Sequence, residues 1–358
     1  MYYFLIVVLF ILLIGACSSC GKDNMMNTKK GTLTTEKIVI VVMAIMFVCV
    51  LGFESELSNG DMQQYQNTYQ LYQIQNPPKL DGKKDYVFQV LCYVFSKTGL
   101  NFYFWHAFIG AFFISVVCVF VKKYSSNVYI SFIVFIALGH FSFSLSALRQ
   151  MLAIAFIIIS FNYIEQKKLV KFLALVVVAS LFHSTAIVFI IAYPLYMVRM
   201  KVKTIAAMVL GMLVIARYIG PIFEFVLPRI GAHELYYDYL ESDTTLSFSG
   251  LIIAFGVLIF AVVCLKGDKE SKYQGLCNFA VVSCFFRLLS TFAFAEMFRL
   301  SLYFSVFDTI LIAEACTCGR KNKTTVFIKT IIVTILLVFY FMISPTSNVT
   351  DYKSFLFI

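Results

Sequence analysis

The stretch FYFWHAFIGAFFISVVCVFV, residues 102–121, is an uncharged run of 20 residues that ends at Lys122 and Lys123. An α-helix rises about 1.5 Å per residue, so 20 residues cover about 30 Å, the thickness of the hydrocarbon core of a bilayer. The two lysines at its end are typical of a junction between membrane and water. This stretch predicts a transmembrane helix.

The rest of the chain repeats this pattern. Of its 358 residues 61% are hydrophobic and 13% are charged, whereas about a quarter of the residues in a soluble domain are charged. We therefore predict an all-α polytopic protein with about 12 transmembrane helices (10–12), forming a single integral membrane domain over residues 1–358. The apolar runs are 2–17, 38–53, 102–121, 127–143, 148–164, 169–182, 185–198, 204–222, 248–265, 274–292, 297–315 and 325–343.

Two parts of this pattern have more than one interpretation. The runs on either side of His183 are two short spans or one long broken helix. The half-apolar segment 86–97 is too short to span and is interpreted as an interfacial or re-entrant helix. At the N-terminus, residues 14–17 resemble a lipoprotein cleavage site. A signal peptide requires basic residues before its apolar stretch, but the first basic residue of this chain is Lys22. A first span is therefore the favoured interpretation.

Basic residues set the predicted orientation. If the first loop is cytoplasmic, the inner segments hold 19 of the 29 Lys and Arg residues, as the positive-inside rule requires. Both termini then face outward. Two long loops, residues 54–101 and 223–247, also lie outside, and all four histidines fall at that side: His106, His140, His183 and His233.

The segment FSFSLSALRQMLAIA, residues 141–155, is the most informative of the outer features. Three serines precede Arg149 and Gln150, which open an apolar helix. Free backbone N–H groups and a guanidinium would meet there, which favours an anion site. The alternative is an interfacial arginine whose side chain extends to the lipid headgroups.

Other polar residues leave similar alternatives open. His183, in LFHST, is a base or hydrogen-bond donor near the membrane surface, or a structural histidine. Arg287 lies within a predicted span and Arg299 opens the next one. These arginines pair with Glu296 or Asp308 as structural contacts, or they complete a basic pocket with Arg149 that holds a diphosphate.

The first outer loop carries Gly60, Asp61 and Tyr65 in a stretch rich in Gln and Tyr. That composition is expected of a surface that faces carbohydrate, and equally of a polar cap on a membrane protein.

Several function classes are excluded or disfavoured. The net charge is +10, yet no basic stripe interleaved with aromatic residues points to nucleic acid. The close pairs of cysteines, Cys17 with Cys20 and Cys316 with Cys318, have no histidine nearby, so we expect no metal and no cofactor. No Walker loop, metalloprotease helix or nucleophile elbow occurs in the outer loops.

The order of these features resembles the EpsG-like, Wzy-type polymerases of bacterial exopolysaccharide and O-antigen, from about residue 38 to 343. One departure is Asp85, where the family pattern usually has Glu. The elements that carry the resemblance are Gly60, Asp61 and Tyr65; Asp85, Tyr86 and Phe88; Arg149, Gln150 and Ala153; Phe182, His183 and Ser184; and Arg299, Tyr303 and Phe304.

The resemblance implies a metal-independent membrane glycosyltransferase with a GT-C-like architecture in the bacterial cytoplasmic membrane. It would join oligosaccharide repeat units carried on undecaprenyl diphosphate into an O-antigen, capsule or exopolysaccharide on the outer face. Its partners would be those lipid-linked glycans, membrane lipid and a regulator of chain length. The expected catalytic residues are His183, Asp61 and Arg149, and the expected substrate-binding residues are Gln150, Arg287, Arg299, Tyr65, Tyr303 and His140.

Two other functions fit the composition. A flippase for lipid-linked oligosaccharides should show internal repeats and matching broken helices, and no such repeat is evident. A membrane acyltransferase using a cytosolic acyl donor would need a histidine on the inner side, whereas all four are predicted to lie outside.

Overall fold

The computed structural model describes residues 1–20, 29–55, 58, 60–74, 85–226, 248–265, 271–292, 295–318, 323–344 and 347–354. Within these ranges the regular secondary structure is helical, and the one strand-like pairing is an isolated antiparallel bridge between Glu54 and Ser354. The chain divides into two compact units, residues 1–190 with 312–358 and residues 191–311. Most of the second outer loop, with His233, lies outside the described residues.

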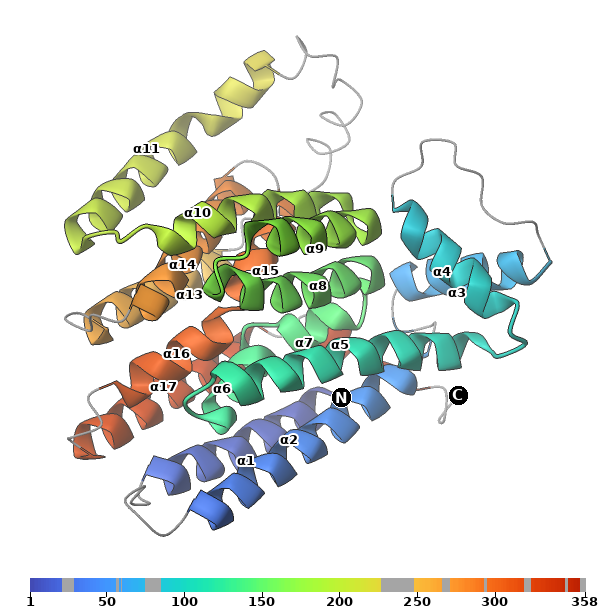
Figure 1. The fold of residues 1–358 in the computed structure, drawn as a ribbon, viewed down its shortest axis with the longest axis horizontal. Helices are drawn as coiled ribbons and strands as arrows, with labels where there is room; N and C mark the ends of the chain where they lie inside the picture. Colours follow the sequence, from blue (N-terminus) through green and yellow to red (C-terminus); the bar gives the residue numbers. More distant parts are fainter. Residues whose placement is uncertain are drawn as a thin grey trace. The chain divides into compact units, whose positions relative to one another are not determined.

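The first unit contains most of the helices (Figure 1). Asparagines start two of them, because the side chains of Asn101 and Asn127 accept hydrogen bonds from the backbone N–H groups of Phe104 and Ile130. The elements are α1 (Tyr2–Cys20), α2 (Lys29–Gly52), α3 (Gly60–Ile74), α4 (Tyr86–Ser96), α5 (Phe102–Tyr124), α6 (Val128–Ala137), α7 (His140–Ser144), α8 (Leu148–Glu165), α9 (Leu169–Phe182), the 3₁₀-helix η2 (Ser184–Ile191), α17 (Lys323–Ile343) and α18 (Ser347–Thr350).

Helix α5, the stretch quoted first, packs against α2, α3, α4, α6 and α8. Its contact with α2 is close because two glycines have no side chain. A Cβ on Gly110 would lie 2.9 Å from Leu51, and one on Gly52 would lie 3.1 Å from Ala107. Small residues at a helix interface are typical of packing within a membrane, where close backbone approach maximises van der Waals contact.

The second unit is organised around one helix, α14 (Ser271–Phe292), which packs against α10 (Ala192–Met197), α11 (Val202–Val226), α13 (Phe248–Cys264) and α15 (Phe298–Ser305). The side-chain amide of Asn278 donates to the carbonyls of Leu195 and Val198 at 2.7 and 2.8 Å. This buried side chain thus joins α14 to the C-terminal end of α10. The remaining elements are η4 (Ala295–Met297) and α16 (Asp308–Thr317), which continues into the first unit.

The all-helical class predicted from sequence is confirmed, and each predicted apolar run falls on a helix or on a pair of consecutive helices. Among the described residues, five helices are long and apolar enough to cross a membrane, or six if α15 and α16, which meet at a bend of 49°, form one span. Breaks shorten several of the others: Gly139 has a φ of 81° between α6 and α7, and His183 is extended between α9 and η2. The count of about twelve spans stays a prediction.

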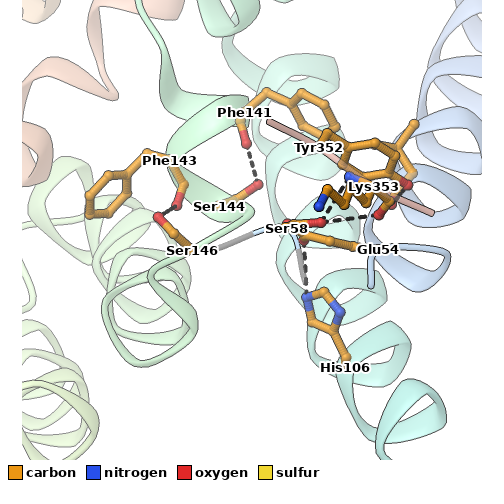
Figure 2. Close-up of polar contacts among 10 residues, drawn as sticks. Glu54, Ser58, His106, Phe141, Phe143, Ser144, Ser146, Tyr352 and Lys353 are labelled. Carbon is orange, nitrogen blue, oxygen red and sulfur yellow. Dashed lines mark hydrogen bonds and ion pairs between the residues drawn. The ribbon is translucent and has the colours of Figure 1, made fainter. Parts of the chain in front are cut away.

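The C-terminal segment is bound to the loop that follows α2. The backbone N–H of Ser55 donates to the carbonyl of Lys353 at 2.8 Å, and the Tyr352 hydroxyl donates to the carbonyl of Val50 at 2.7 Å. Figure 2 shows this segment beside Glu54, whose carboxylate lies 3.9 Å from Nε2 of His106. Both of these side chains are fully buried, and burial raises the pKa of Glu54 well above its ordinary value.

This raised pKa predicts a pH-dependent stability. The native state binds the Glu54 proton more tightly than the unfolded state, so stability falls as pH rises from the ordinary carboxyl value through the raised native value. We expect Glu54→Gln to remove this part of the pH dependence and to raise the apparent Tm by about 3 °C at alkaline pH. The dependence of Tm on pH is measured by thermal unfolding of both proteins in detergent between about pH 5 and about pH 8.

The matched control is Asp351→Asn, which removes an exposed carboxylate from the same C-terminal segment. That variant should keep the wild-type pH dependence. Equal slopes of Tm against pH for wild type and Glu54→Gln would contradict the prediction.

Candidate functional site

Three segments of the first unit that lie far apart in the sequence meet at the carboxylate of Asp85. Nη1 of Arg149 donates to Oδ2 of Asp85 at 2.9 Å, and Nδ1 of His183 lies 3.5 Å from the same oxygen. The backbone N–H of Ser184 donates to the other oxygen, Oδ1, at 3.2 Å. One carboxylate therefore joins the Arg149 motif to the His183 motif.

The ends of helices position these groups. Asp85 directly precedes α4, Arg149 lies in the first turn of α8, and His183 follows the last residue of α9. Figure 1 shows α4 at the end of the paired helices α8 and α9, and α4 packs against α9. The N–H of Ser184 is available because it stands at the start of η2, where backbone donors have no helical partner.

Burial differs among the three side chains. Asp85 is 4% exposed, His183 is 16% exposed and Arg149 is 43% exposed. Burial alone would raise the pKa of Asp85, but the contact with His183, the charge of Arg149 and the N–H of Ser184 outweigh it, and the pKa is lowered. Asp85 is therefore ionised at neutral pH, and Arg149 is accessible to a ligand from outside.

Asp85, Arg149, His183 and Ser184 form a cluster, here called the Asp85 cluster, to which Tyr65 on α3 also belongs. The guanidinium carbon of Arg149 lies 6.0 Å from the centroid of its ring, a cation–π distance. The same ring meets Phe88 edge-on at 5.6 Å, and Phe88 meets Trp105 at 5.4 Å. Burial raises the pKa of Tyr65 although the charge of Arg149 opposes this effect, so its hydroxyl stays protonated.

Asp61 stands one helical turn before Tyr65 on α3 and is exposed. Its charge acts on both Tyr65 and Arg149. Residues four apart share a helix face, so Asp61 lies on the same side of α3 as the aromatic ring.

The serines before Arg149 bond to the backbone of their own segment. Ser144 and Ser146 donate their hydroxyl hydrogens to the carbonyls of Phe141 and Phe143, three residues earlier (Figure 2). Ser142 does the same with Gly139. These hydroxyls are buried within the chain's own turns, so an anion at this point would be bound by Arg149 and not by the serines.

Two other predicted residues of this unit are in the protein interior. His140 is buried and its ring stacks on Phe135 at 6.0 Å. Gln150 is 2% exposed, on α8 next to Arg149. Their predicted role in binding substrate stays a prediction.

The remaining predicted residues belong to the second unit. Nε of Arg299 lies 2.6 Å from Oε2 of Glu296, so the structural ion pair that the sequence left open is present. The guanidinium carbons of Arg287 and Arg299 lie 5.8 and 6.0 Å from the ring centroid of Phe298. Tyr303 is fully buried. A basic pocket that combines these arginines with Arg149 stays a prediction.

Metal ligands do not gather in the described part of the chain. No group of three or more His, Cys, Asp or Glu side chains that could hold a metal ion occurs there. The cluster at Asp85 instead offers an accessible guanidinium, an imidazole with its Nε2 directed away from a carboxylate, and a phenol. Such a set is suited to binding an anion beside a group that accepts a proton.

A comparison with protein-family models matches residues 37–354 to the EpsG family. The chain belongs to the EpsG family. This match confirms the resemblance drawn from the motifs, and it covers all the residues of the Asp85 cluster. Comparisons with curated proteins and with solved structures found no match.

In this EpsG-family chain, sequence reasoning assigned no role to Asp85, the residue at the centre of the cluster. The available signal was an acidic residue before an amphipathic helix, which more often indicates a helix cap. The side chain of Asp85 makes no hydrogen bond to its own helix, and its tertiary partners are 64 and 99 residues away.

The aromatic contacts predict that Phe88 supports the cluster. Phe88 is 4% exposed between Tyr65 and Trp105. Phe88→Ala should leave a cavity and lower the free energy of unfolding by about 3 to 5 kcal/mol, which would lower the Tm in detergent. The matched control is Phe104→Ala on α5, where the ring is 61% exposed and the expected change is within about 0.5 kcal/mol. Equal losses of stability in the two variants would contradict the supporting role of Phe88.

Proposed function

We propose that this EpsG-family protein polymerises oligosaccharide repeat units carried on undecaprenyl diphosphate into a surface polysaccharide, an O-antigen, capsule or exopolysaccharide. The reaction takes place on the outer face of the bacterial cytoplasmic membrane, with both termini facing outward. The family match supports polymer synthesis, and the apolar helices support a membrane location. A regulator of chain length is a further proposed partner.

The finer architecture is part of the same proposal. We infer about twelve spans in a GT-C-like arrangement, because every predicted apolar run is helical and several runs are made of two short helices. Short and broken helices are tolerated at membrane depth where they are enclosed by protein or line a cavity. A polymerase that admits a lipid-linked glycan from the side requires such a cavity.

The observation that carries the proposal is the contact of Arg149 and His183 with one carboxylate. In the transfer, the bond between the anomeric carbon of the donor sugar and the diphosphate breaks, through a transition state with oxocarbenium character. The hydroxyl oxygen of the acceptor sugar bonds to that carbon. Arg149 stabilises the charge on the diphosphate that leaves, with no metal required.

The proton of the acceptor hydroxyl must also be removed. His183 is the proposed base, since its Nδ1 faces Asp85 and leaves Nε2 for the acceptor. Asp61 is the second candidate, because it is exposed near Tyr65 and Arg149. The roles of Gln150, Tyr65, Tyr303, His140, Arg287 and Arg299 in binding the lipid-linked glycan are part of this proposal.

Loss of the gene tests the function directly. In cells that lack it, single lipid-linked repeat units should accumulate and the ladder of long surface polysaccharide should disappear, and the wild-type gene should restore both. The readouts are a gel of surface polysaccharide and a chromatogram of lipid extracts. An unchanged ladder with a missing modification would indicate an acyltransferase, and repeat units trapped in the cytoplasmic leaflet would indicate a flippase.

The side chain of Arg149 gives a residue-level prediction. Arg149→Ala should lower the rate of polymerisation by about 100-fold or more, because a donor to the developing negative charge is lost. The amount of protein in the membrane, followed by immunoblot, should not change. Arg149→Lys should give an intermediate rate, because it keeps the charge and loses the planar fork of donors.

The matched control is Arg199→Ala, which removes an exposed arginine that follows α10. This variant should produce the wild-type ladder. A wild-type polymer length in Arg149→Ala would refute the anion-binding role of Arg149.

A further inference from the structure

We propose that Asp85 is a positioning residue that holds His183 as its Nδ1–H tautomer and so presents Nε2 to the acceptor hydroxyl. This inference rests on the proposed function, because it assigns the orientation of the base in that reaction. It gives a role to a residue for which the sequence offered none.

The first argument is backbone geometry. Asp85 has a φ of 64° and a ψ of 34°, the left-handed conformation that residues other than glycine seldom adopt. Such conformations persist where the surrounding structure enforces them, and they gather at functional sites. The chain accepts this strain at the residue whose carboxylate joins the motifs of α8 and α9.

The second argument is a hydrogen bond that Asp85 does not make. An aspartate at this position ordinarily accepts from the first N–H groups of its own helix, which stabilises the helix. The side chain of Asp85 makes no such bond to α4. It is turned toward Arg149, His183 and Ser184, so local helix stability is not what determines its orientation.

The third argument is the two-point contact with consecutive residues. Oδ1 of Asp85 accepts from the backbone N–H of Ser184, and Oδ2 lies 3.5 Å from Nδ1 of His183. The hydrogen bond from Ser184 fixes the rotation of the carboxylate. Oδ2 is thereby held facing Nδ1 of the imidazole ring. When a carboxylate faces Nδ1, the proton resides there and Nε2 is the acceptor.

The shared oxygen links this contact to donor binding. Oδ2 also accepts from Nη1 of Arg149, whose side chain is 43% exposed. A diphosphate that binds Arg149 would draw part of that charge away from Asp85. The carboxylate would then stabilise the imidazolium that forms when Nε2 takes the acceptor proton, and Asp85 itself would remain ionised.

Among the described residues, the charged groups near His183 come from separate elements. Arg149 of α8 shares Oδ2 of Asp85 with His183, and Arg149 in turn lies beside Tyr65 of α3. Helix α9 carries one lysine, Lys171, in its first turn at the opposite end, and the residues of η2 include no titratable side chain. A variant of Asp85 therefore changes the carboxylate that faces His183 and leaves the side chains of these elements in place.

Asp85→Asn is the decisive variant, because Asn tolerates a positive φ nearly as well as Asp and has the same size. We expect it to lower kcat by about 100-fold or more at neutral pH, because the group that holds the proton on Nδ1 and leaves Nε2 free for the acceptor is lost. Asp85→Glu, which keeps a carboxylate, should retain more of the wild-type kcat than Asp85→Asn. The substrate is lipid-linked repeat units extracted from cells that lack the gene, added to the full-length protein in lipid nanodiscs.

A second measurement needs no activity. In protein labelled with ¹⁵N-histidine, the signal that disappears in His183→Gln identifies His183 among the four histidines. Its nitrogen shifts should report the Nδ1–H tautomer in wild type and the Nε2–H tautomer in Asp85→Asn. Glu54→Gln is the matched control, because it removes a buried carboxylate beside His106 instead and should leave the His183 signal unchanged.

The outcomes separate the two proposals. If wild-type protein forms no polymer from these units while the tautomer still depends on Asp85, the polymerase proposal fails and the positioning contact stands. If wild type polymerises and Asp85→Asn changes neither the tautomer of His183 nor kcat, the positioning role is refuted and the polymerase proposal stands.

Discussion

The ionised carboxylate of Asp85, buried with a side-chain exposure of 4%, imposes a constraint on the first unit. A charge in such a place is unfavourable unless hydrogen bonds and an opposite charge compensate it. Arg149, His183 and the N–H of Ser184 provide this compensation, so the starts of α8 and η2 and the end of α9 must all reach the start of α4. Tyr65 and Phe88 then pack where that convergence places them.

The parts of the fold that the sequence predicted are those set by local pattern. Apolar runs predicted the helices, because backbone groups in a bilayer must be satisfied within the segment itself. The length of each helix was less predictable, since a single φ of 81° at Gly139 or one extended residue at His183 divides a run in two. Among the described residues, five helices, or six with the bent pair, are both long and apolar enough to cross a membrane, and the count of about twelve spans stays a prediction.

The candidate site was also predicted only in part. Arg149 and His183 were identified because a charge and an imidazole at the ends of apolar runs are conspicuous in any single sequence. Asp85 was named in the family resemblance but was given no role, because its importance comes from a left-handed backbone and from partners distant in the sequence. The hydroxyls of the serines in residues 142–146 are bonded within their own segment, because serine hydroxyls in a helical turn readily bond to carbonyls three or four residues earlier.

Two carboxyl–histidine contacts in the same unit show why residue type alone does not define a site. Glu54 beside His106 is fully buried, and burial raises the pKa of Glu54. Asp85 beside His183 is almost as buried, yet its pKa is lowered, because Arg149 and the Ser184 N–H favour the anion. Only the second contact keeps a charge next to an imidazole that solvent can reach. A carboxylate that faces Nδ1 of an imidazole leaves Nε2 to accept a proton, which is the property that the proposed base requires.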